Sequence, residues 1–429
     1  MRVLFLARQP PVSLDNGSRI RTHALVSQLA DAAAVHLLAF DTQPGSTLPR
    51  QSVDSVVRAL PRLEAVTLVR PRVTSKRRMQ IETLFGAGSY LFRQHRSAPM
   101  ARALARVIDT FQPDLLHCDN LLLGEFARAV PPTVVTAIAP ENVESHLMRR
   151  MAETTDSPLR RRLYAREGQL LKRWEDASLR NYDLCRAVSE DDAQHFAKLG
   201  ANAVCIPNGV SPHPIPKPVV PLRDGEPMRL LFVGSGSYEP NRIGVAWFID
   251  SVLPLLVSQM AVELTLVGSG WEEQNHAHCH IMGHVASLDA YYETHHAAIV
   301  PLRAGGGSRL KVAEAIAKGV PLVGTSVGLE GYPLDPGVHA LVGDTPQDLA
   351  THLRWLCDAL RGDSAAVDRQ VAAAFGVIER FFWDEIGDRL ITVYGEAIAR
   401  KHGLPSDRLA QRRGGSGRET HDPQHISTA

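Results

Sequence analysis

Short apolar runs alternate with helical patterns along the first half of the chain. The opening run, Val3 to Ala7, is apolar at every position, which is typical of a strand buried on both faces of a parallel sheet. A loop follows it, and apolar positions then recur at helical spacing at Ile20, Ala24, Leu25 and Leu29. Further strands are predicted at 35–40, 66–69, 114–117, 133–139, 184–188 and 203–206, and helices at 100–111 and 159–181. This alternation predicts an α/β domain with a parallel sheet.

A proline-rich stretch separates this pattern from a second one. Residues 208–227 have no amphipathic period and contain Pro212, Pro214, Pro216, Pro218 and Pro221, so they predict an extended linker. After the linker, strands are predicted at 230–233, 262–267, 298–301, 322–324 and 340–341, and helices at 244–253, 288–295, 310–318 and 348–360. Two Rossmann-like domains of about 200 residues each are the economical architecture.

The composition fits a globular protein and argues against one class of partner. Hydrophobic residues make up 44% of the chain and charged residues 22%, which is enough apolar material for sizeable cores. The net charge of +1 argues against a nucleic-acid partner. Up to residue 215, 28 Lys and Arg stand against 21 Asp and Glu, and after it 19 stand against 25. A basic first half would suit an anionic surface or acceptor, and chance variation between solvated faces explains it equally well.

Nothing in the sequence predicts a disulfide framework, a zinc site or a membrane span. The five cysteines are scattered without a CxxC pair. The apolar run at the N-terminus is too short for a signal-peptide core, and no run approaches the roughly 18 apolar residues of a transmembrane helix. We therefore expect a cytoplasmic protein that at most rests on the inner face of a membrane.

A glycine-rich loop between a predicted strand and a predicted helix carries the richest chemistry. A strand ends near Pro301, the loop contains Gly305, Gly306 and Gly307, and a helix begins near Arg309. Glycines let backbone N–H groups approach an anion, and a helix N-terminus adds partial positive charge. A tight turn before a solvated basic helix has the same appearance, so the loop alone is weak evidence.

Charged side chains follow this loop at positions that suit a nucleotide. Arg309 and Lys311 would stabilise a diphosphate, including the negative charge that grows on it as a bond breaks. Glu314 lies about one helical turn further on, where a carboxylate can accept hydrogen bonds from ribose hydroxyls.

Several motifs, in order along the chain, resemble those of family 4 glycosyltransferases. The run from Gly305 to Val323 resembles the donor-site signature of the subgroup with a GGGxRLKxxEA pattern. Similar motifs occur at 231–241, 264–270 and 281–285 in the second half, and at 15–19, 141–145, 187–190 and 206–210 in the first. The resemblance covers roughly residues 1 to 400, and agreement of several independent motifs makes chance an unsatisfactory explanation.

The resemblance implies the GT-B fold, an α/β architecture of two Rossmann-like domains that face each other across a cleft. It assigns 1–212 to the acceptor-side domain, 213–227 to the linker, 228–375 to the nucleotide-sugar donor domain, and 376–403 to helices that cross back to the N-terminal domain. The polar residues 404–429 are expected to be a disordered tail.

The resemblance also implies which residues form the site. Arg309 and Lys311 would lie at the diphosphate, Glu314 would hold the ribose, and Gly17 would approach from the other domain. The full set implied for the donor is Gly17, Gly234, Asn241, Gly268, Met282, Gly306, Gly307, Ser308, Arg309, Lys311 and Glu314.

Two positions depart from the family pattern. The first carboxylate of the family's E-x7-E motif contacts the donor sugar, but this chain has Gly306 there, so backbone groups or other side chains must hold the sugar. Many relatives have His or Asp before Asn-Val-Glu, whereas this chain has Glu141, which could orient an acceptor hydroxyl. Glu141 is therefore the catalytic candidate beside Arg309 and Lys311. Glu144 and His146 are acceptor-side candidates, and a merely solvated loop is the alternative for all three.

The resemblance implies a retaining, metal-independent enzyme of polysaccharide or cell-envelope glycoconjugate synthesis. Its donor would be a UDP- or GDP-linked sugar, its acceptor a glycan or a polyprenyl-linked sugar, and it would need no cofactor. The chain has no Asp-x-Asp, the usual metal–diphosphate device of the other large glycosyltransferase fold. In the implied mechanism the leaving phosphate takes the acceptor proton, and the protein mostly positions groups and neutralises charge.

Three other functions compete with this one. A nucleotide-sugar epimerase shares the fold but would need its own catalytic carboxylates and histidine. A non-catalytic scaffold would explain Gly306, although Arg309, Lys311 and Glu314 are retained. A dinucleotide oxidoreductase is least favoured, because no GxGxxG follows the first strand.

Two further clusters have simple structural explanations. The aromatic residues Phe381, Phe382 and Trp383 are predicted to pack where the C-terminal helices cross. A second cluster is basic and largely helical, and it is predicted to be a solvated helix face, with docking to an anionic membrane through the N-terminal domain as the alternative. Its members are Arg149, Arg150, Arg160, Arg161, Arg162 and Arg166.

Overall fold

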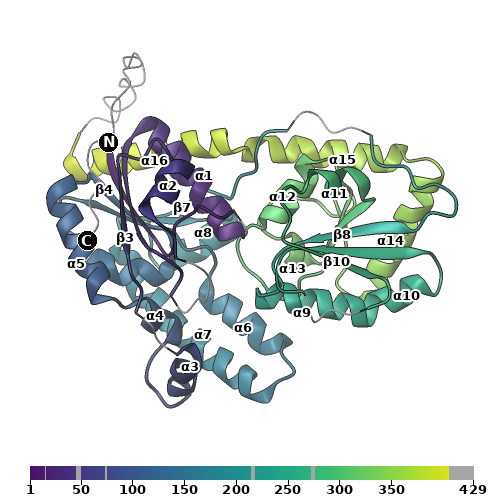
Figure 1. Cartoon of the computed structure of the whole chain (residues 1–429), viewed down its shortest axis with the longest axis horizontal. Coiled ribbons are helices and arrows are strands. Elements are labelled where there is room, and N and C mark those ends of the chain that lie inside the picture. The colour runs from purple at the N-terminus through teal and green to yellow at the C-terminus, as the bar shows by residue number, and fades with distance from the viewer. Residues whose placement is uncertain (15, 45–49, 73–74, 214–217, 272–275, 405–429) are drawn as a thin grey trace.

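The computed structural model describes residues 1–14, 16–44, 50–72, 75–213, 218–271 and 276–404. Two α/β units lie side by side, and a line of C-terminal helices runs along both of them (Figure 1). Each unit contains one sheet in which every neighbouring pair of strands is parallel. The predicted pair of Rossmann-like units is therefore confirmed.

The N-terminal unit contains a seven-stranded sheet in the order β3-β2-β1-β4-β5-β6-β7. Its central strands are buried on both faces because they are continuous apolar runs. The strands are β1 Arg2–Ala7, β2 Ala34–Phe40, β3 Ala65–Val69, β4 Leu115–Cys118, β5 Val135–Ile138, β6 Leu184–Ala187 and β7 Ala203–Cys205. The helices are α1 Gly17–Ala32, α2 Val53–Ala59, α3 Lys76–Leu84, α4 Tyr90–His95, α5 Ala98–Phe111, α6 Glu144–Thr154, α7 Pro158–Ser178 and α8 Glu190–Lys198, with 3-10 turns at Leu121–Ala129 and Leu179–Asn181.

The C-terminal unit contains a six-stranded sheet in the order β10-β9-β8-β11-β12-β13. The strands are β8 Met228–Val233, β9 Val262–Val267, β10 Cys279–Gly283, β11 Ala297–Val300, β12 Leu322–Gly324 and β13 Leu341–Val342. The helices are α9 Glu239–Trp247, α10 Leu253–Val257, α11 Asp289–Thr294, α12 Leu310–Ala317, α13 Ser326–Leu329, α14 Pro346–Arg361 and α15 Ala365–Ile378, with a π turn at Phe248–Val252.

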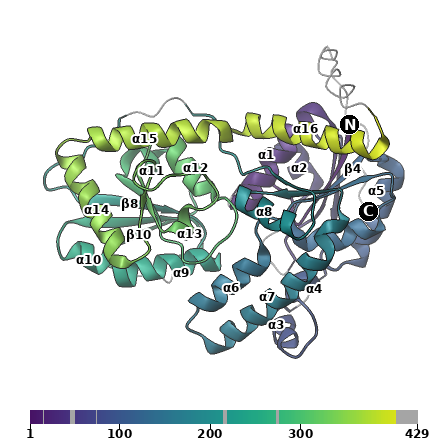
Figure 2. The ribbon, with the colours of Figure 1, turned by 180° about the vertical axis from the view of Figure 1, so that it is seen from behind.

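The chain crosses back to the N-terminal unit after α15. A 3-10 turn at Glu379–Phe381 leads into α16, Trp383–His402, which packs along α1 (Figure 2). Val210 lies beside the crossing segment, because its N–H donates to the Phe381 carbonyl at 2.9 Å and its own carbonyl accepts from the Trp383 N–H at 3.1 Å. Phe381 and Trp383 are buried, so the predicted packing role of these two aromatic residues is confirmed.

Several elements differ from the sequence prediction. The helix predicted at 244–253 begins earlier, at Glu239, because Pro240 at its first turn is compatible with a helix start. No helix was predicted at α2, α3, α4, α6, α8, α13 or α15, and no apolar run predicted the edge strand β10. The predicted domain limit at 375 falls inside α15. Residues 405–429 of the predicted tail lie outside the described residues, and only Leu404 of that tail is described. Pro214 and Pro216 of the predicted linker likewise lie outside the described residues.

None of the helices in the described ranges has the length and apolarity that crossing a bilayer requires.

Candidate functional site

The glycine-rich loop lies between β11 and α12 and faces the other unit. Gly305 has φ +158° and Gly307 has φ +65°, and Arg309 is the N-cap residue of α12. A positive φ of this kind is readily adopted by glycine, so Gly307 can turn the chain tightly before the helix begins. The N-terminus of α1 meets that of α12, since a Cβ added to Gly17 would lie 3.3 Å from Leu310 Cδ1. Two helix N-termini therefore converge on the space between the units, and each favours negative charge.

Lys311 is a half-buried cation at this convergence. Its Nζ donates to Asn241 Oδ1 at 2.9 Å and lies 3.9 Å above the centre of the Phe232 ring. No carboxylate pairs with it among the residues that the structure describes. Burial, together with the nearby charge of Arg309, lowers the pKa of Lys311 to about 7.

Arg309 is buried, and its guanidinium group is held on the glycine loop. It donates to the Gly307 carbonyl, and its Nη2 lies 3.4 Å from Glu330 Oε2. Burial lowers the pKa of Arg309, and the charge of Glu330 opposes this effect. Glu330 in turn accepts hydrogen bonds from both terminal nitrogens of the Arg150 guanidinium group, at 2.7 and 2.8 Å. Because Arg150 belongs to α6 of the N-terminal unit, this ion pair joins the two units.

Glu314 lies one turn beyond Lys311 on α12. The Tyr292 hydroxyl donates to Glu314 Oε2 at 3.3 Å, and burial raises the pKa of Glu314. A carboxylate with one oxygen engaged in this way can accept a hydrogen bond from a ribose hydroxyl on its other oxygen.

Three of the remaining positions that the sequence predicts for the donor lie at the carboxyl ends of neighbouring strands, and a fourth lies in α9. Gly234 and Gly268 pack directly together, since a Cβ on Gly268 would lie 2.3 Å from the Gly234 carbonyl oxygen. Asn241 is buried and donates to the Ser235 carbonyl at 2.8 Å while it accepts from Lys311. Met282, on the edge strand β10, is 45% exposed. The strand ends therefore form one rim, with Met282 at its outer end.

The N-terminal unit packs against the glycine loop through Glu141 and Asn142. A Cβ on Gly307 would lie 2.3 Å from the Glu141 carbonyl oxygen, and one on Gly306 would lie 3.0 Å from Asn142 Cβ. The neighbours of the Asn142 amide are the carbonyl oxygens of Gly306 and Glu141, at 2.8 and 3.1 Å, so its nitrogen donates to both. Asn142 therefore occupies the space that a side chain at position 306 would need.

Ser308 forms a second bridge between the units. Its hydroxyl accepts from the Asn208 backbone N–H at 3.2 Å, and its carbonyl accepts from the Asn208 side-chain amide at 2.9 Å. Three segments of the N-terminal unit thus hold the loop, at Asn142, Arg150 and Asn208.

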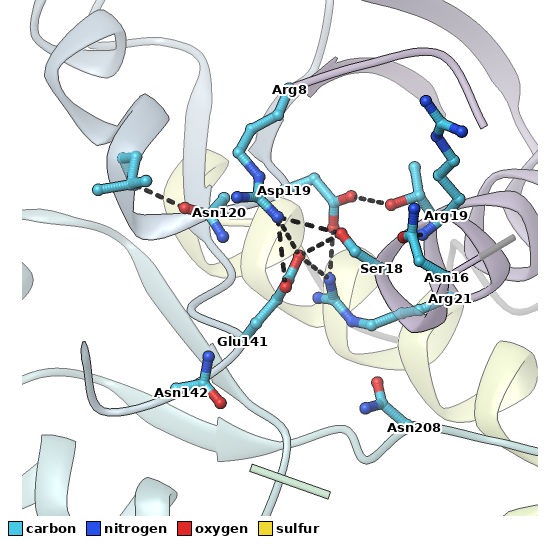
Figure 3. Close-up of polar contacts among 12 residues, drawn as sticks. Arg8, Asn16, Ser18, Arg19, Arg21, Asp119, Asn120, Glu141, Asn142 and Asn208 are labelled. Carbon is cyan, nitrogen blue, oxygen red and sulfur yellow. Dashed lines mark hydrogen bonds and ion pairs between the residues drawn. The ribbon is translucent and has the colours of Figure 1, made fainter. Parts of the chain in front are cut away.

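The Glu141 carboxylate is held by three donors (Figure 3). The Ser18 hydroxyl donates to it at 2.8 Å, Arg8 Nη2 lies 3.4 Å from both of its oxygens, and Arg21 Nη1 lies 3.5 Å from Oε1. The Glu141 side chain is 19% exposed and that of Arg21 only 2%. Glu141 is therefore an oriented, partly accessible carboxylate rather than a freely solvated one.

Arg21 connects this carboxylate to a buried network that reaches the crossing helix. Arg21 Nη1 donates to Asp119 Oδ1 at 3.0 Å, and His117 Nε2 lies 3.2 Å from the same oxygen. His117 Nδ1 lies 2.5 Å from the Tyr394 hydroxyl of α16. Burial lowers the pKa of His117, so a neutral ring that donates to Asp119 and accepts from Tyr394 fits these contacts.

Glu144 and His146 lie at the cleft end of α6. Glu144 is buried, and burial with the nearby Glu141 charge raises the pKa of Glu144 to about 7. Burial lowers the pKa of His146 to about 4, and its ring centre lies 4.5 Å from that of His195. His146 and His195 line a cavity of about 170 Å³ beside the glycine loop. His146 is therefore neutral at pH 7, whereas Glu144 is a group that can exchange a proton there.

The structure brings the sequence-predicted residues together but adds others. One part of the predicted set gathers around the glycine loop and the N-terminus of α12, and Glu141 and Glu144 lie opposite in the N-terminal unit. That part consists of Arg309, Lys311, Glu314, Gly17, Gly234, Asn241 and Gly268. Met282 and His146 lie at the margins of this arrangement. Sequence reasoning gave no role to eight residues of this arrangement, which are Arg8, Ser18, Arg21, Asp119, Asn142, Asn208, Tyr292 and Glu330. Signals for some of them were present, because Ser18, Asn142 and Asn208 lie inside motifs that carry the family resemblance. Asp119 also follows the end of a predicted strand by two residues.

Comparison with known proteins identifies the class. Residues 16–209 match the family described as glycosyl transferase 4-like domain, and residues 227–359 match glycosyl transferases group 1. No curated protein sequence matches the chain significantly. The two matched regions together span most of the chain, which belongs to the family 4-like GT-B glycosyltransferases.

Solved structures show the same fold. A sucrose-phosphate synthase from Thermosynechococcus elongatus superposes with a TM-score of 0.67 at 16% identity, over 93% of this chain and 99% of that one. HepE of Anabaena, in complex with UDP and glucose, superposes with a TM-score of 0.63 at 13% identity, over 92% of this chain and 100% of that one. The lipopolysaccharide outer core galactosyltransferase WaaB, in its apo form, superposes with a TM-score of 0.55 at 14% identity, over 94% of this chain and 100% of that one. The predicted GT-B fold and family are confirmed, and the protein is a glycosyltransferase.

Proposed function

We propose that this glycosyltransferase takes a nucleotide-diphosphate sugar in the cleft and transfers the sugar with retention of configuration and without a metal ion. The acceptor in this proposal is a glycan or a polyprenyl-linked sugar. The observation that carries the proposal is the pair of cations at the N-terminus of α12, the buried Arg309 and the half-buried Lys311, facing the N-terminus of α1.

The diphosphate is the group that this pair fits. Lys311 Nζ has an amide oxygen and an aromatic ring as neighbours, so an anion would supply the counter-charge that this half-buried ammonium group lacks. Two cations and two helix N-termini provide the positive charge that other enzymes of this chemistry obtain from a metal. Glu314 beyond Lys311 would then hold the ribose. The complexes of HepE with UDP and with UDP-glucose make UDP the first nucleotide to test.

The transfer step needs no protein nucleophile. The bond between the anomeric carbon and the diphosphate oxygen breaks, and the acceptor oxygen forms its new bond on the same face. The acceptor proton passes to the departing diphosphate oxygen. The negative charge on that oxygen grows next to Arg309 and Lys311, which therefore stabilise the transition state more than the ground state.

Glu141 is assigned to the acceptor. Its contacts with Arg8, Ser18 and Arg21 leave it partly exposed at the mouth of the N-terminal unit, where it can accept a hydrogen bond from an acceptor hydroxyl. The sugar-contacting carboxylate of the family is absent at Gly306, and Asn142 occupies that place. We assign the side-chain oxygen of Asn142 to a donor-sugar hydroxyl.

Thermal shift measurements test the donor site directly. Wild-type protein and Glu314→Ala would be heated with UDP, GDP, ADP and their sugar conjugates in the presence of EDTA. We expect one nucleotide to raise the midpoint of the wild type and to lose its effect in the variant, because a ligand that binds only the folded state stabilises it. Glu293→Ala, an exposed glutamate on the neighbouring α11, is the matched control. If no nucleotide raises the midpoint, with or without metal, a non-catalytic scaffold becomes the better explanation.

The stereochemistry requires a second measurement. With the nucleotide identified and acceptors screened, proton NMR of the first turnover gives the anomeric configuration of the product. A product of inverted configuration would refute the retaining mechanism while it leaves the donor site intact.

A further inference from the structure

The outward face of α3 carries apolar side chains. The helix buries Met79 and Thr83 against its own unit, whereas Ile81 is 50% exposed and Phe85, at the C-terminal end, is 86% exposed. Residues four apart share a helix face, so Arg77, Ile81 and Phe85 form one outward stripe. A helix that turns its apolar stripe away from its own core has no partner for that stripe within the unit.

Basic side chains surround this stripe. Lys76, Arg77 and Arg78 are all exposed at the start of α3. Arg78 pairs with Glu82, whereas Lys76 and Arg77 have no ion pair within the described part of the chain. The stripe is therefore apolar at its centre and positively charged at its N-terminal end.

The first turn of α7 lies beside α3 and repeats the pattern. The two helices pack through Met79 and Leu163, with Tyr90 of α4 in the same cluster, and both views place them at the same end of the N-terminal unit (Figures 1 and 2). Leu159, one turn before Leu163, is 67% exposed, and among the large hydrophobic side chains of the described residues only Phe85 is more exposed. Three exposed arginines, at 160–162, follow Leu159 directly, and of these Arg160 pairs with Glu239 of the other unit at 2.9 Å.

We propose that α3 and the first turn of α7 form a docking surface for an anionic lipid membrane. Ile81, Phe85 and Leu159 enter the boundary between headgroups and acyl chains, and the basic residues of the two triplets at 76–78 and 160–162, apart from Arg160 with its pair to Glu239, lie among the anionic headgroups. A nucleic acid would use the basic residues but would give the three apolar side chains nothing to bury against. A membrane uses both halves of the surface.

The surface is also close to the cleft. Helix α6 begins at Glu144 and its 11 residues lead towards Pro158 of α7, and a helix of that length spans roughly 16 Å. Docking would thus bring a lipid-borne acceptor near Glu141 and Glu144. This last step rests on the proposed function, whereas the docking itself does not.

Vesicle sedimentation tests the docking without donor or acceptor. The full-length protein would be mixed with vesicles of phosphatidylcholine alone, and with vesicles of equal parts phosphatidylcholine and phosphatidylglycerol. We expect binding to the anionic vesicles that weakens as salt is raised. The double variant Ile81→Ala with Phe85→Ala should bind them at least about tenfold more weakly. Lys76→Gln and Arg77→Gln should each weaken binding by about fivefold.

Matched controls separate this surface from general effects. Trp355→Ala removes a half-exposed aromatic residue from α14 of the other unit, and Arg102→Gln with Arg106→Gln removes two exposed charges from α5; both should bind as the wild type does. Phe85 is exposed, so the folding midpoint of its variant should be unchanged. Absence of wild-type binding, equal binding to both vesicles, or an unaffected Phe85 variant would each overturn the proposal. Retention of the protein on RNA without vesicle binding would assign the basic triplets to another polyanion and would also overturn it. None of these outcomes bears on the donor site.

Discussion

Lys311 makes donor binding depend on pH in a way that the structure quantifies. Burial lowers the pKa of Lys311 in the free protein to about 7, so its ammonium group loses its proton as the pH rises through that value. A bound diphosphate favours the charged form and raises this pKa again, so binding takes up a proton above neutral pH. At pH 8 about a tenth of the free protein has Lys311 charged, and affinity should be about tenfold lower than at pH 6, or about 1.4 kcal/mol.

Isothermal titration calorimetry measures this effect. The ligand should be the nucleotide sugar identified by thermal shift, because its diphosphate does not change its charge between pH 6 and pH 8. Repeating each titration in buffers of different ionisation enthalpy reports the proton taken up. Lys311→Arg should bind with an affinity that is flat over this range, since a guanidinium group stays charged. Lys311→Met should bind weakly at both pH values. An unchanged affinity from pH 6 to pH 8 in the wild type, or no loss in Lys311→Met, would refute the assignment of Lys311 to the diphosphate.

Three further predictions concern closure and stability. Gly307→Ala should abolish transfer in steady-state assays, because its Cβ would meet the Glu141 carbonyl oxygen at 2.3 Å. The control Gly337→Ala has φ +78° and no atom within 4 Å of the added Cβ, so it should lose only about 1–2 kcal/mol of stability to backbone strain and should keep its transfer rate. Arg150→Ala should shift the free protein towards an open form, since it breaks the bidentate ion pair between the units. Small-angle scattering should give this variant a larger radius of gyration than the control Arg161→Ala, and equal radii would contradict this role. Tyr394→Phe should lower the free energy of unfolding by about 1–3 kcal/mol, because His117 loses its buried hydrogen-bond donor. Urea denaturation measures this loss, and an unchanged denaturation midpoint would show that the contact contributes nothing to stability.

Most of the fold could be predicted because its strands are continuous apolar runs. Apart from the exposed edge strand β10, both sheets have their strands where these runs occur, with limits that differ by one or two residues. Two of the missed helices, α3 and α6, depart from the usual pattern of a buried apolar face. Helix α15 does not depart from it, because Val367, Val371 and Ile378 are buried at helical spacing. In α3 the apolar residues Ile81 and Phe85 point outward, and in α6 a buried position is taken by Glu144. Hydrophobic periodicity is a weak signal for a helix that exposes a phenyl ring, as α3 does, or that buries a carboxylate, as α6 does.

The donor side was accessible to sequence reasoning because its groups follow one another along the chain. Arg309, Lys311 and Glu314 share one loop and one helix, so their spacing alone places them together. The acceptor side depends on residues far apart in sequence. Arg21 is held by Asp119 and in turn orients Glu141, and no local pattern records that arrangement. Asn142 likewise replaces a side chain at position 306, which becomes visible only when the two units are placed against each other.

The path of α16 has a consequence for how the protein is made. Trp383, Ile386, Leu390 and Tyr394 complete the core that α1 and the strands of the N-terminal unit begin. A ribosome releases these residues only after almost all of the described chain has been synthesised, so the first unit emerges with one wall of its core missing. It must wait, with apolar surface exposed, until the second unit has been made. A fragment that ends in the linker would carry the same exposed face permanently, which makes the GT-B chain a single folding unit despite its two sheets.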